Sequence, residues 1–282
     1  MRKVQIVTDS NCHIPESLRH ELGIHVVQLP YVWDGVTYLD ETDMGPREFF
    51  SKLRQSDTIP TTSAPTPGSF RELFEDLAKS GDPILVIHVG SEFSHTFKTA
   101  ELAKAMLPGI DIHLIDSHSN ALGMGFQVLA VARAAREGKD LEDLIVIADQ
   151  ARASTGVIFL VKDVKYIHRG GRINLGQRII ASSLNLVPIM EIRHGPVELI
   201  HIARSYKKAM GKMVDIVKDR LEDGSPIRIG VHHADNEADA YELRKTIEDL
   251  INPDELILEQ LNPILGIHTG PGALGLAYCL NV

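Results

Sequence analysis

The sequence holds little cysteine and no excess of positive charge. Only two of its 282 residues are cysteines, Cys12 and Cys279, which excludes both a disulfide framework and a cysteine-rich zinc cluster. Lys and Arg total 29 against 38 Asp and Glu, and the resulting net charge of −9 argues against binding to nucleic acid, which needs a basic surface.

Long hydrophobic runs are also missing. No apolar segment approaches the roughly 20 residues that a membrane-spanning helix needs, and the segment after Met1 turns polar too early for a signal peptide. Hydrophobic residues nevertheless make up 44% of the sequence and charged residues 24%, which is the composition of a folded globular protein. We therefore expect a cytoplasmic protein that does not insert into membranes.

The first half of the sequence predicts alternating strands and helices. Apolar runs at 84–89 and 112–115 are typical of strands that are buried on both faces of a parallel sheet. Apolar residues recur at helical spacing over 70–77, and Asp34-Gly35 is typical of a hairpin turn. This pattern predicts an α/β domain with a doubly wound, mostly parallel sheet.

The second half of the sequence predicts a different arrangement of strands. Strands are predicted at 156–161, 187–193, 197–203, 227–232 and 256–261, and the second and third of them form an antiparallel hairpin. We expect a domain boundary near residue 153. Residues 1–153 then form the α/β domain and residues 154–282 an α+β domain, with a ligand tunnel near their interface.

Hydroxyl-rich loops follow three of the predicted parallel strands, at 8–11, 91–96 and 116–119. Open α/β sheets bind ligands at the carboxyl ends of their strands, so these loops are candidates for a binding site. The same loops also fit helix caps, with Ser94 capping one helix and Ser119 or Asn120 the next, or turns. Both interpretations stay open, because a capped helix N-terminus can also hold an anion.

Two glycine- or proline-rich segments have alternative interpretations. Residues 60–68 combine prolines with neighbouring hydroxyls and fit either a stiff loop of hydrogen-bond donors or a plain linker. The glycines at 270–275 resemble a dinucleotide-binding fingerprint, but that fingerprint must follow a first strand and open a helix. The better interpretation is a tight turn that brings His268 and Thr269 to a site.

Charged and metal-ligating residues give two weaker signals. Among 13 histidines, His232 and His233 form the best cluster, but neighbours on a strand point to opposite faces and cannot chelate one ion together without distortion. We expect no metal and no cofactor. Arg169 and Arg172 flank two glycines and fit either a solvated loop or a guanidinium aimed at an anionic group.

Five short motifs, taken together, resemble the DegV family of bacterial fatty-acid-binding proteins. They are Thr8-Asp9-Ser10, Thr61-Thr62-Ser63, Ser94, Gly171-Arg172 and the segment from His268 to Gly275. Their order and spacing match over essentially the whole sequence. The resemblance implies a two-domain protein that holds one long-chain fatty acid in a tunnel, with the carboxylate near the domain interface.

The resemblance also implies site residues. The hydroxyls of Thr62 and Ser94 and the imidazole of His268 match the groups that contact the carboxylate in the family. The full set of candidate ligand-binding residues is Thr62, Ser63, Ser94, Arg172, His268 and Thr269. Two positions depart from the family pattern, because His95 and Ala64 stand where members commonly have Gly and Gln.

Two other function classes stay open. A serine-dependent esterase or thioesterase would use Ser94 as nucleophile and His268 or His95 as base, although the Gly-x-Ser-x-Gly elbow is missing. A sensor for a ligand other than a lipid is the second alternative. We expect a binding protein without catalytic residues, because none of the carboxylate contacts requires a nucleophile or a general base.

The resemblance further implies a partner, a separate kinase that phosphorylates the bound fatty acid. Arg204, Lys207 and Lys208 lie at a predicted helix start, where the helix dipole disfavours cations. Such a basic group on an acidic protein fits either a docking surface for this kinase or a solvated helix start.

Overall fold

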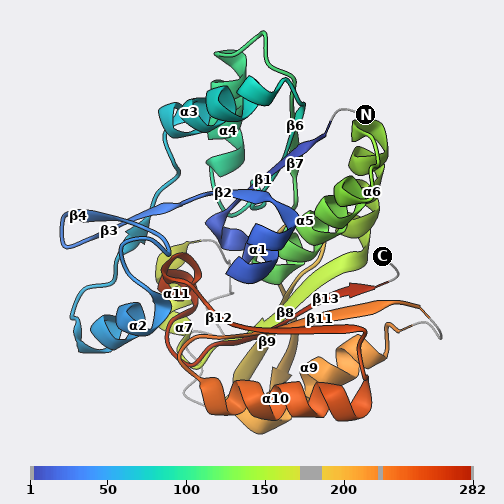
Figure 1. Ribbon diagram of the computed structural model, residues 1–282. Coiled ribbons are helices and arrows are strands. Elements are labelled where there is room, and N and C mark those ends of the chain that lie inside the picture. The colour runs from blue at the N-terminus through green and yellow to red at the C-terminus, as the bar shows by residue number, and fades with distance from the viewer. Residues whose placement is uncertain (1–2, 172–185, 222–224, 281–282) are drawn as a thin grey trace.

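The computed structural model describes residues 3–171, 186–221 and 225–280 (Figure 1). Its first sheet has four parallel strands in the order β2-β1-β6-β7. Their bounds are Ile24–Val27 for β2, Gln5–Asp9 for β1, Ile84–His88 for β6 and Ile112–Asp116 for β7. This sheet confirms the expected parallel α/β fold, and it places the predicted hydroxyl-rich loops at one edge.

The first sheet is covered by helices on both faces, because its strand side chains alternate in direction. Val7 and Val86 pack on one side against α3 and α4, whereas Ile6 and Leu85 pack on the other side against α5. The helices of this half are α1 (Glu16–Leu22), α3 (Pro67–Leu77), α4 (Thr96–Ala105), α5 (Ala121–Arg136) and α6 (Leu141–Ser154).

The second sheet has six strands in the order β10-β9-β8-β13-β11-β12, of which β11 and β12 are the parallel pair. Helix α5 packs against one face, through contacts that include Val157 and Ala277, while α9 and α10 cover the other (Figure 1). The bounds are β8 (Thr155–Leu160), β9 (Val187–Ile192), β10 (Glu198–Ala203), α9 (Tyr206–Lys218), β11 (Ile227–His233), α10 (Glu237–Leu250), β12 (Glu255–Gln260) and β13 (Leu274–Leu280). Helix α5 is therefore the layer that the two sheets share.

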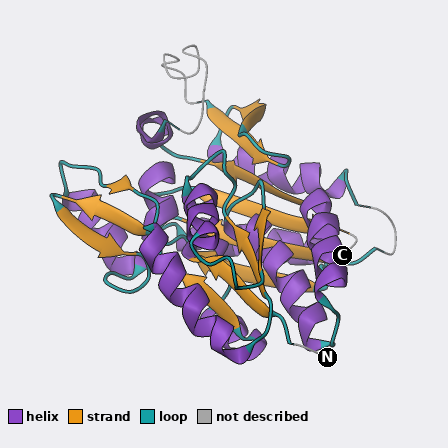
Figure 2. Cartoon of the chain, turned by 90° about the horizontal axis from the view of Figure 1, so that it is seen from above, coloured by secondary structure: helices purple, strands orange, loops and turns teal. Residues whose placement is uncertain are grey.

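A small third sheet, β4-β3-β5, stands beside both. Its hairpin projects from the side of the molecule in both views (Figures 1 and 2), and aromatic side chains of the hairpin and α2 pack against α11. The bounds here are β3 (Pro30–Trp33), β4 (Val36–Leu39), α2 (Pro46–Gln55), β5 (Thr61–Thr62), α7 (Val164–Gly170) and α11 (Pro263–Thr269).

Most predicted elements are confirmed, including the turn at Asp34-Gly35 and the antiparallel pair β9–β10. The sequence patterns did not predict α2, α7, α11, β5 or β13. Over 270–275 they indicated only a turn, whereas β13 begins at Leu274 and lies in the centre of the second sheet. The domain boundary near residue 153 stays a prediction. Among the described helices, none combines the length and the apolar character that crossing a membrane would need.

Candidate ligand-binding site

A cavity of about 360 Å³ lies where the carboxyl edge of the first sheet meets the second sheet and α11. Its size falls within the roughly 300–1,000 Å³ that is usual for small-molecule sites. Most of its wall is apolar: Leu29, Phe93, Ala121, Val157, Phe159, Ile167, Ile192, Val197, Leu261, Ile264, Leu265, Ala273 and Leu274. Aliphatic and aromatic walls of this kind hold a hydrocarbon better than a sugar or a nucleotide.

Thr62 and His268 come together at one part of this wall. The Thr62 Oγ1 atom lies 3.0 Å from His268 Nε2, although the two residues are 206 positions apart in the sequence. Thr62 is fixed by the pairing of β5 with Tyr31 of β3, and His268 lies in the last turn of α11. Both side chains are half-buried and line the cavity.

Helix α11 is held in place at its N-terminus by buried polar groups. The Asn262 side chain accepts a hydrogen bond from Leu265 N at 3.2 Å, and its Nδ2 donates to Asp40 at 2.5 Å and to Ser10 O at 2.8 Å. Burial raises the pKa of the Asp40 carboxyl well above its ordinary value. These contacts fix the position from which His268 reaches the cavity.

Ser94 and His95 line the cavity from the loop after β6. The Ser94 hydroxyl accepts a hydrogen bond from Thr96 N at 3.2 Å and lies 2.7 Å from Thr96 Oγ1. The expected cap at Ser94 is thus displaced by one position, because the N-cap residue of α4 is His95 and its side chain makes no capping bond. Buried Asp9 holds the start of this loop by accepting from Val89 N at 2.9 Å.

The other predicted residues of the site divide into three groups. Ser63 and Ala64 line the cavity beside Thr62. Thr269 also lines it, but its hydroxyl donates back to Leu265 O at 2.9 Å within α11. Arg172 lies outside the described residues.

Three further polar residues of the cavity wall lie outside the predicted ligand set: Asn11, which belongs to the candidate loop at 8–11, Asn120 and His232. They meet at the start of α5, where Ala121 N donates to Asn11 Oδ1 at 3.4 Å and Leu122 N donates to His232 Nε2 at 3.3 Å. Ser119 does not cap this helix, and Asn120 at the N-cap position makes no capping bond with its side chain. The sequence carries no local signal for these contacts, because Asn11 and His232 each lie 110 positions from their partners.

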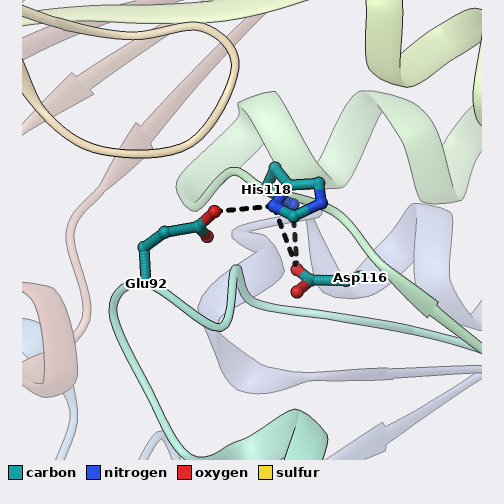
Figure 3. Close-up of side chains that lie close together, drawn as sticks. All are labelled: Glu92, Asp116 and His118. Carbon is teal, nitrogen blue, oxygen red and sulfur yellow. Dashed lines mark hydrogen bonds and ion pairs between the residues drawn. The ribbon is translucent and has the colours of Figure 1, made fainter.

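One cluster among the described residues has the ligand types of a metal centre. The ligand atoms of Glu92, Asp116 and His118 lie within 4.8 Å of one another (Figure 3). The His118 Nδ1 atom is 2.7 Å from Glu92 Oε1 and 3.9 Å from Asp116 Oδ1. Hydrogen bonds between the loops after β6 and β7 account for this arrangement. His232 lines the cavity, whereas His233 Nδ1 accepts a hydrogen bond from Asn236 N at 3.3 Å.

The three basic residues that were predicted as a docking surface are all exposed at the start of α9. Ser205 caps this helix by accepting from Lys208 N at 3.3 Å. Lys207 Nζ lies 3.4 Å from Glu242 Oε1 of α10. Because the Lys207 side chain is 86% exposed, solvent screens this ion pair and it contributes little to stability. Arg204 and Lys208 form no ion pair with the described residues.

The fold and the site define an α/β protein with an apolar cavity between two sheets and with hydroxyl and imidazole groups in the cavity wall. The family model described as "Uncharacterised protein, DegV family" matches residues 3–281, and the chain belongs to the DegV family. This confirms the resemblance that the motifs indicated.

Relatives and solved structures agree over the full length. A DegV domain-containing protein of Halalkalibacterium halodurans is 31% identical and covers 100% of both chains. A structure from Thermus thermophilus, described by the words "Fatty Acid Binding of a DegV family Protein", has a TM-score of 0.90 at 31% identity and covers 99% of both chains. The structure of DegV from Bacillus subtilis, described as a fatty acid binding protein, has a TM-score of 0.91 at 30% identity and the same coverage.

Proposed function

We propose that the protein binds one long-chain fatty acid, with its carboxylate at Thr62, Ser94 and His268 and its tail in the apolar cavity. The observation that carries the proposal is the pairing of Thr62 with His268 in the wall of an otherwise largely apolar cavity. The fatty-acid binding stated for the Thermus and Bacillus proteins supports it, since both match this chain over 99% of its length.

The tail supplies most of the binding energy. Burying a sixteen-carbon chain at roughly 0.8 kcal/mol per CH₂ gives about 12 kcal/mol before the costs of association. That is enough for a complex that survives purification.

The carboxylate needs donors, because an unpaired buried charge is very costly. A relay serves this need: His268 Nε2–H donates to Thr62 Oγ1, whose own proton then points to the carboxylate, and Ser94 adds a second hydroxyl. This direction requires the tautomer of His268 with its proton on Nε2. We assign Arg172 as the charge partner and Ser63 and Thr269 as neighbours of the head group.

The esterase alternative has less support. The Ser94 hydroxyl accepts a hydrogen bond from Thr96 N at 3.2 Å and lies 2.7 Å from Thr96 Oγ1. A nucleophilic serine is activated by a base in hydrogen-bond contact with its hydroxyl, and the candidate base His268 has its Nε2 atom 3.0 Å from Thr62 Oγ1. We therefore assign Ser94 to ligand binding. An assay for ester hydrolysis by wild type and Ser94→Ala tests this, because turnover that Ser94→Ala abolishes would overturn the assignment.

The test of the proposed function is the ligand itself. Organic extraction of the purified protein, followed by mass spectrometry, should yield about one long-chain fatty acid per chain. Delipidated protein should then take up palmitate with a stoichiometry of one. Absence of lipid from several preparations, together with no palmitate uptake, would refute the proposal and favour a sensor for another ligand.

We also propose that a separate kinase phosphorylates the carboxylate and docks on Arg204, Lys207 and Lys208. Their exposure and positive charge on a chain of net charge −9 support this role. The double change Arg204→Glu and Lys207→Glu should slow kinase-dependent phosphorylation, most at low salt, and leave lipid occupancy unchanged. The matched control is Lys218→Glu, an exposed reversal at the other end of α9. Loss of bound lipid, or an equal effect of the control, would contradict the docking role.

A further inference from the structure

The cavity holds a second polar group that the proposed carboxylate site does not use. Asn11, Asn120 and His232 line the same cavity as Thr62 and His268, and we call these three the inner polar cluster. They gather around the first turn of α5, where Asn11 and His232 accept backbone N–H groups at 3.4 and 3.3 Å. The cluster therefore comes from the segment after β1, the start of α5 and β11, whereas Thr62 and His268 belong to β5 and α11.

His232 keeps one hydrogen-bond donor without a partner. Its side chain is 1% exposed, and burial lowers its pKa well below the ordinary value, so the ring is neutral at physiological pH. Because Nε2 accepts from Leu122 N, the single ring proton lies on Nδ1. That Nδ1–H has no hydrogen-bond partner among the described residues.

Gly275 leaves space beside the Nδ1–H group of His232. It stands opposite His232 in the pairing of β13 with β11, and it too lines the cavity. A Cβ atom at this position would lie 3.7 Å from His232 Nδ1, in van der Waals contact. Glycine removes that atom and leaves room beside Nδ1.

Asn120 adds both a donor and an acceptor. It holds the N-cap position of α5, yet its side chain forms no capping bond, because the first turn is already served by Asn11 and His232. The half-buried amide lines the cavity, and no described residue receives a hydrogen bond from it. The amide group is therefore available to a ligand.

An unsubstituted hydrocarbon tail is a poor match for this cluster. A buried donor or acceptor that loses water and gains no partner costs about 1–3 kcal/mol. A site with such groups discriminates against a ligand that lacks the matching oxygen. We propose that the cavity selects a fatty acid with a hydroxyl or keto oxygen along its chain, which accepts from His232 Nδ1–H and hydrogen-bonds the Asn120 amide.

The inference rests on the proposed fatty-acid site, and a competition experiment separates the two. Delipidated protein is titrated with stearate, with positional isomers of hydroxystearate and with the matching ketostearates. We expect at least one position to bind tenfold or more tightly than stearate. Stearate that binds as well as every substituted acid would overturn the inference and leave the proposed function standing. Failure of all the acids to bind would overturn both.

The variant Asn120→Leu tests the cluster directly, because Asn120 supports no described contact whose loss would unfold α5. The preference for the best substituted acid over stearate should fall at least fivefold. Thr62→Val is the matched control: it removes a head-group contact, so both acids should weaken in parallel and their ratio should hold. A ratio unchanged by Asn120→Leu would mean that a retained water satisfies the cluster, and the inference would fail.

Discussion

Replacing Thr62 by valine tests the head-group geometry with little change in shape. Valine keeps the β-branched side chain and the pairing of β5 with Tyr31, and it removes only the hydroxyl that lies 3.0 Å from His268 Nε2. A hydrogen bond to a charged group contributes about 1.5–3 kcal/mol. The dissociation constant for palmitate should therefore rise roughly 10- to 150-fold, at about 1.4 kcal/mol per factor of ten.

The neighbouring residue offers a matched control. Thr61 is exposed and precedes Thr62 on β5, so the two side chains point to opposite faces of the strand. Thr61→Val makes the same chemical change outside the cavity, and its dissociation constant should stay within twofold of wild type. Calorimetric titration of delipidated protein with palmitate measures both variants, and circular dichroism checks that both are folded.

One result would contradict a contact between Thr62 and the carboxylate. If Thr62→Val and Thr61→Val bind palmitate equally well, the hydroxyl of Thr62 does not contact the carboxylate. The relay from His268 would then have no acceptor, and the head group would lie elsewhere in the cavity. A weakening beyond about 150-fold would instead indicate that the loss of Thr62 also displaces His268.

Two further predictions concern stability. Burial lowers the pKa of His13, so the stability contributed by neutral His13 is fully present above the ordinary histidine pKa of about 6.5 and is lost as the pH falls below it. Burial raises the pKa of Asp40, whose contribution therefore changes with pH in the opposite direction. The urea midpoint should therefore fall more between pH 7 and pH 5 in wild type than in His13→Gln, and equal falls would contradict this. Gly266→Ala places a Cβ atom 2.8 Å from two phenylalanine rings of α2 and should destabilise the protein by about 1–3 kcal/mol. Gly211→Ala has open space in α9 and should stabilise the protein slightly. Urea unfolding that ranks the two variants in the other order would refute the packing argument.

Elements with a strong local signal were predictable from the sequence. The apolar run at 84–89 forms β6, and Asp140, directly before the first residue of α6, caps that helix by accepting from Asp143 N at 3.0 Å. Both depend on neighbours in the sequence, namely continuous burial and a capping oxygen. Local information was sufficient for them.

Two of the missed elements next to the cavity, α11 and β13, lack such a signal for a physical reason. Helix α11 has only seven residues and is buried almost throughout, so it shows no polar face and no helical periodicity. Its one local sign is Asn262 followed by Pro263, a capping residue and a proline at the first helical position. Strand β13 is buried on both faces and so shows no alternation of polar and apolar residues, and the glycines before it indicate only a turn.

Some residues of the candidate site were predictable from sequence motifs, and others were not. Thr62, Ser94 and His268 were identified through the family motifs, because nothing in their spacing places residues 62 and 268 in contact. The inner polar cluster has no motif, and its members lie in three separate segments. Only the tertiary structure brings them to one point.

That point is the start of α5, and it explains why polar side chains persist in an apolar cavity. A helix N-terminus needs partners for its first N–H groups, and here the residue at the N-cap position supplies none. Asn11 from the segment after β1 and His232 from β11 take that role, each 110 positions from its partner in the sequence. Because Asn11 Oδ1 and His232 Nε2 are already engaged, the Nδ1–H of His232 and the amide of Asn120 are the groups of the cluster left for a ligand. The hydrogen bonds to the start of α5 thus account for the polar groups inside the cavity.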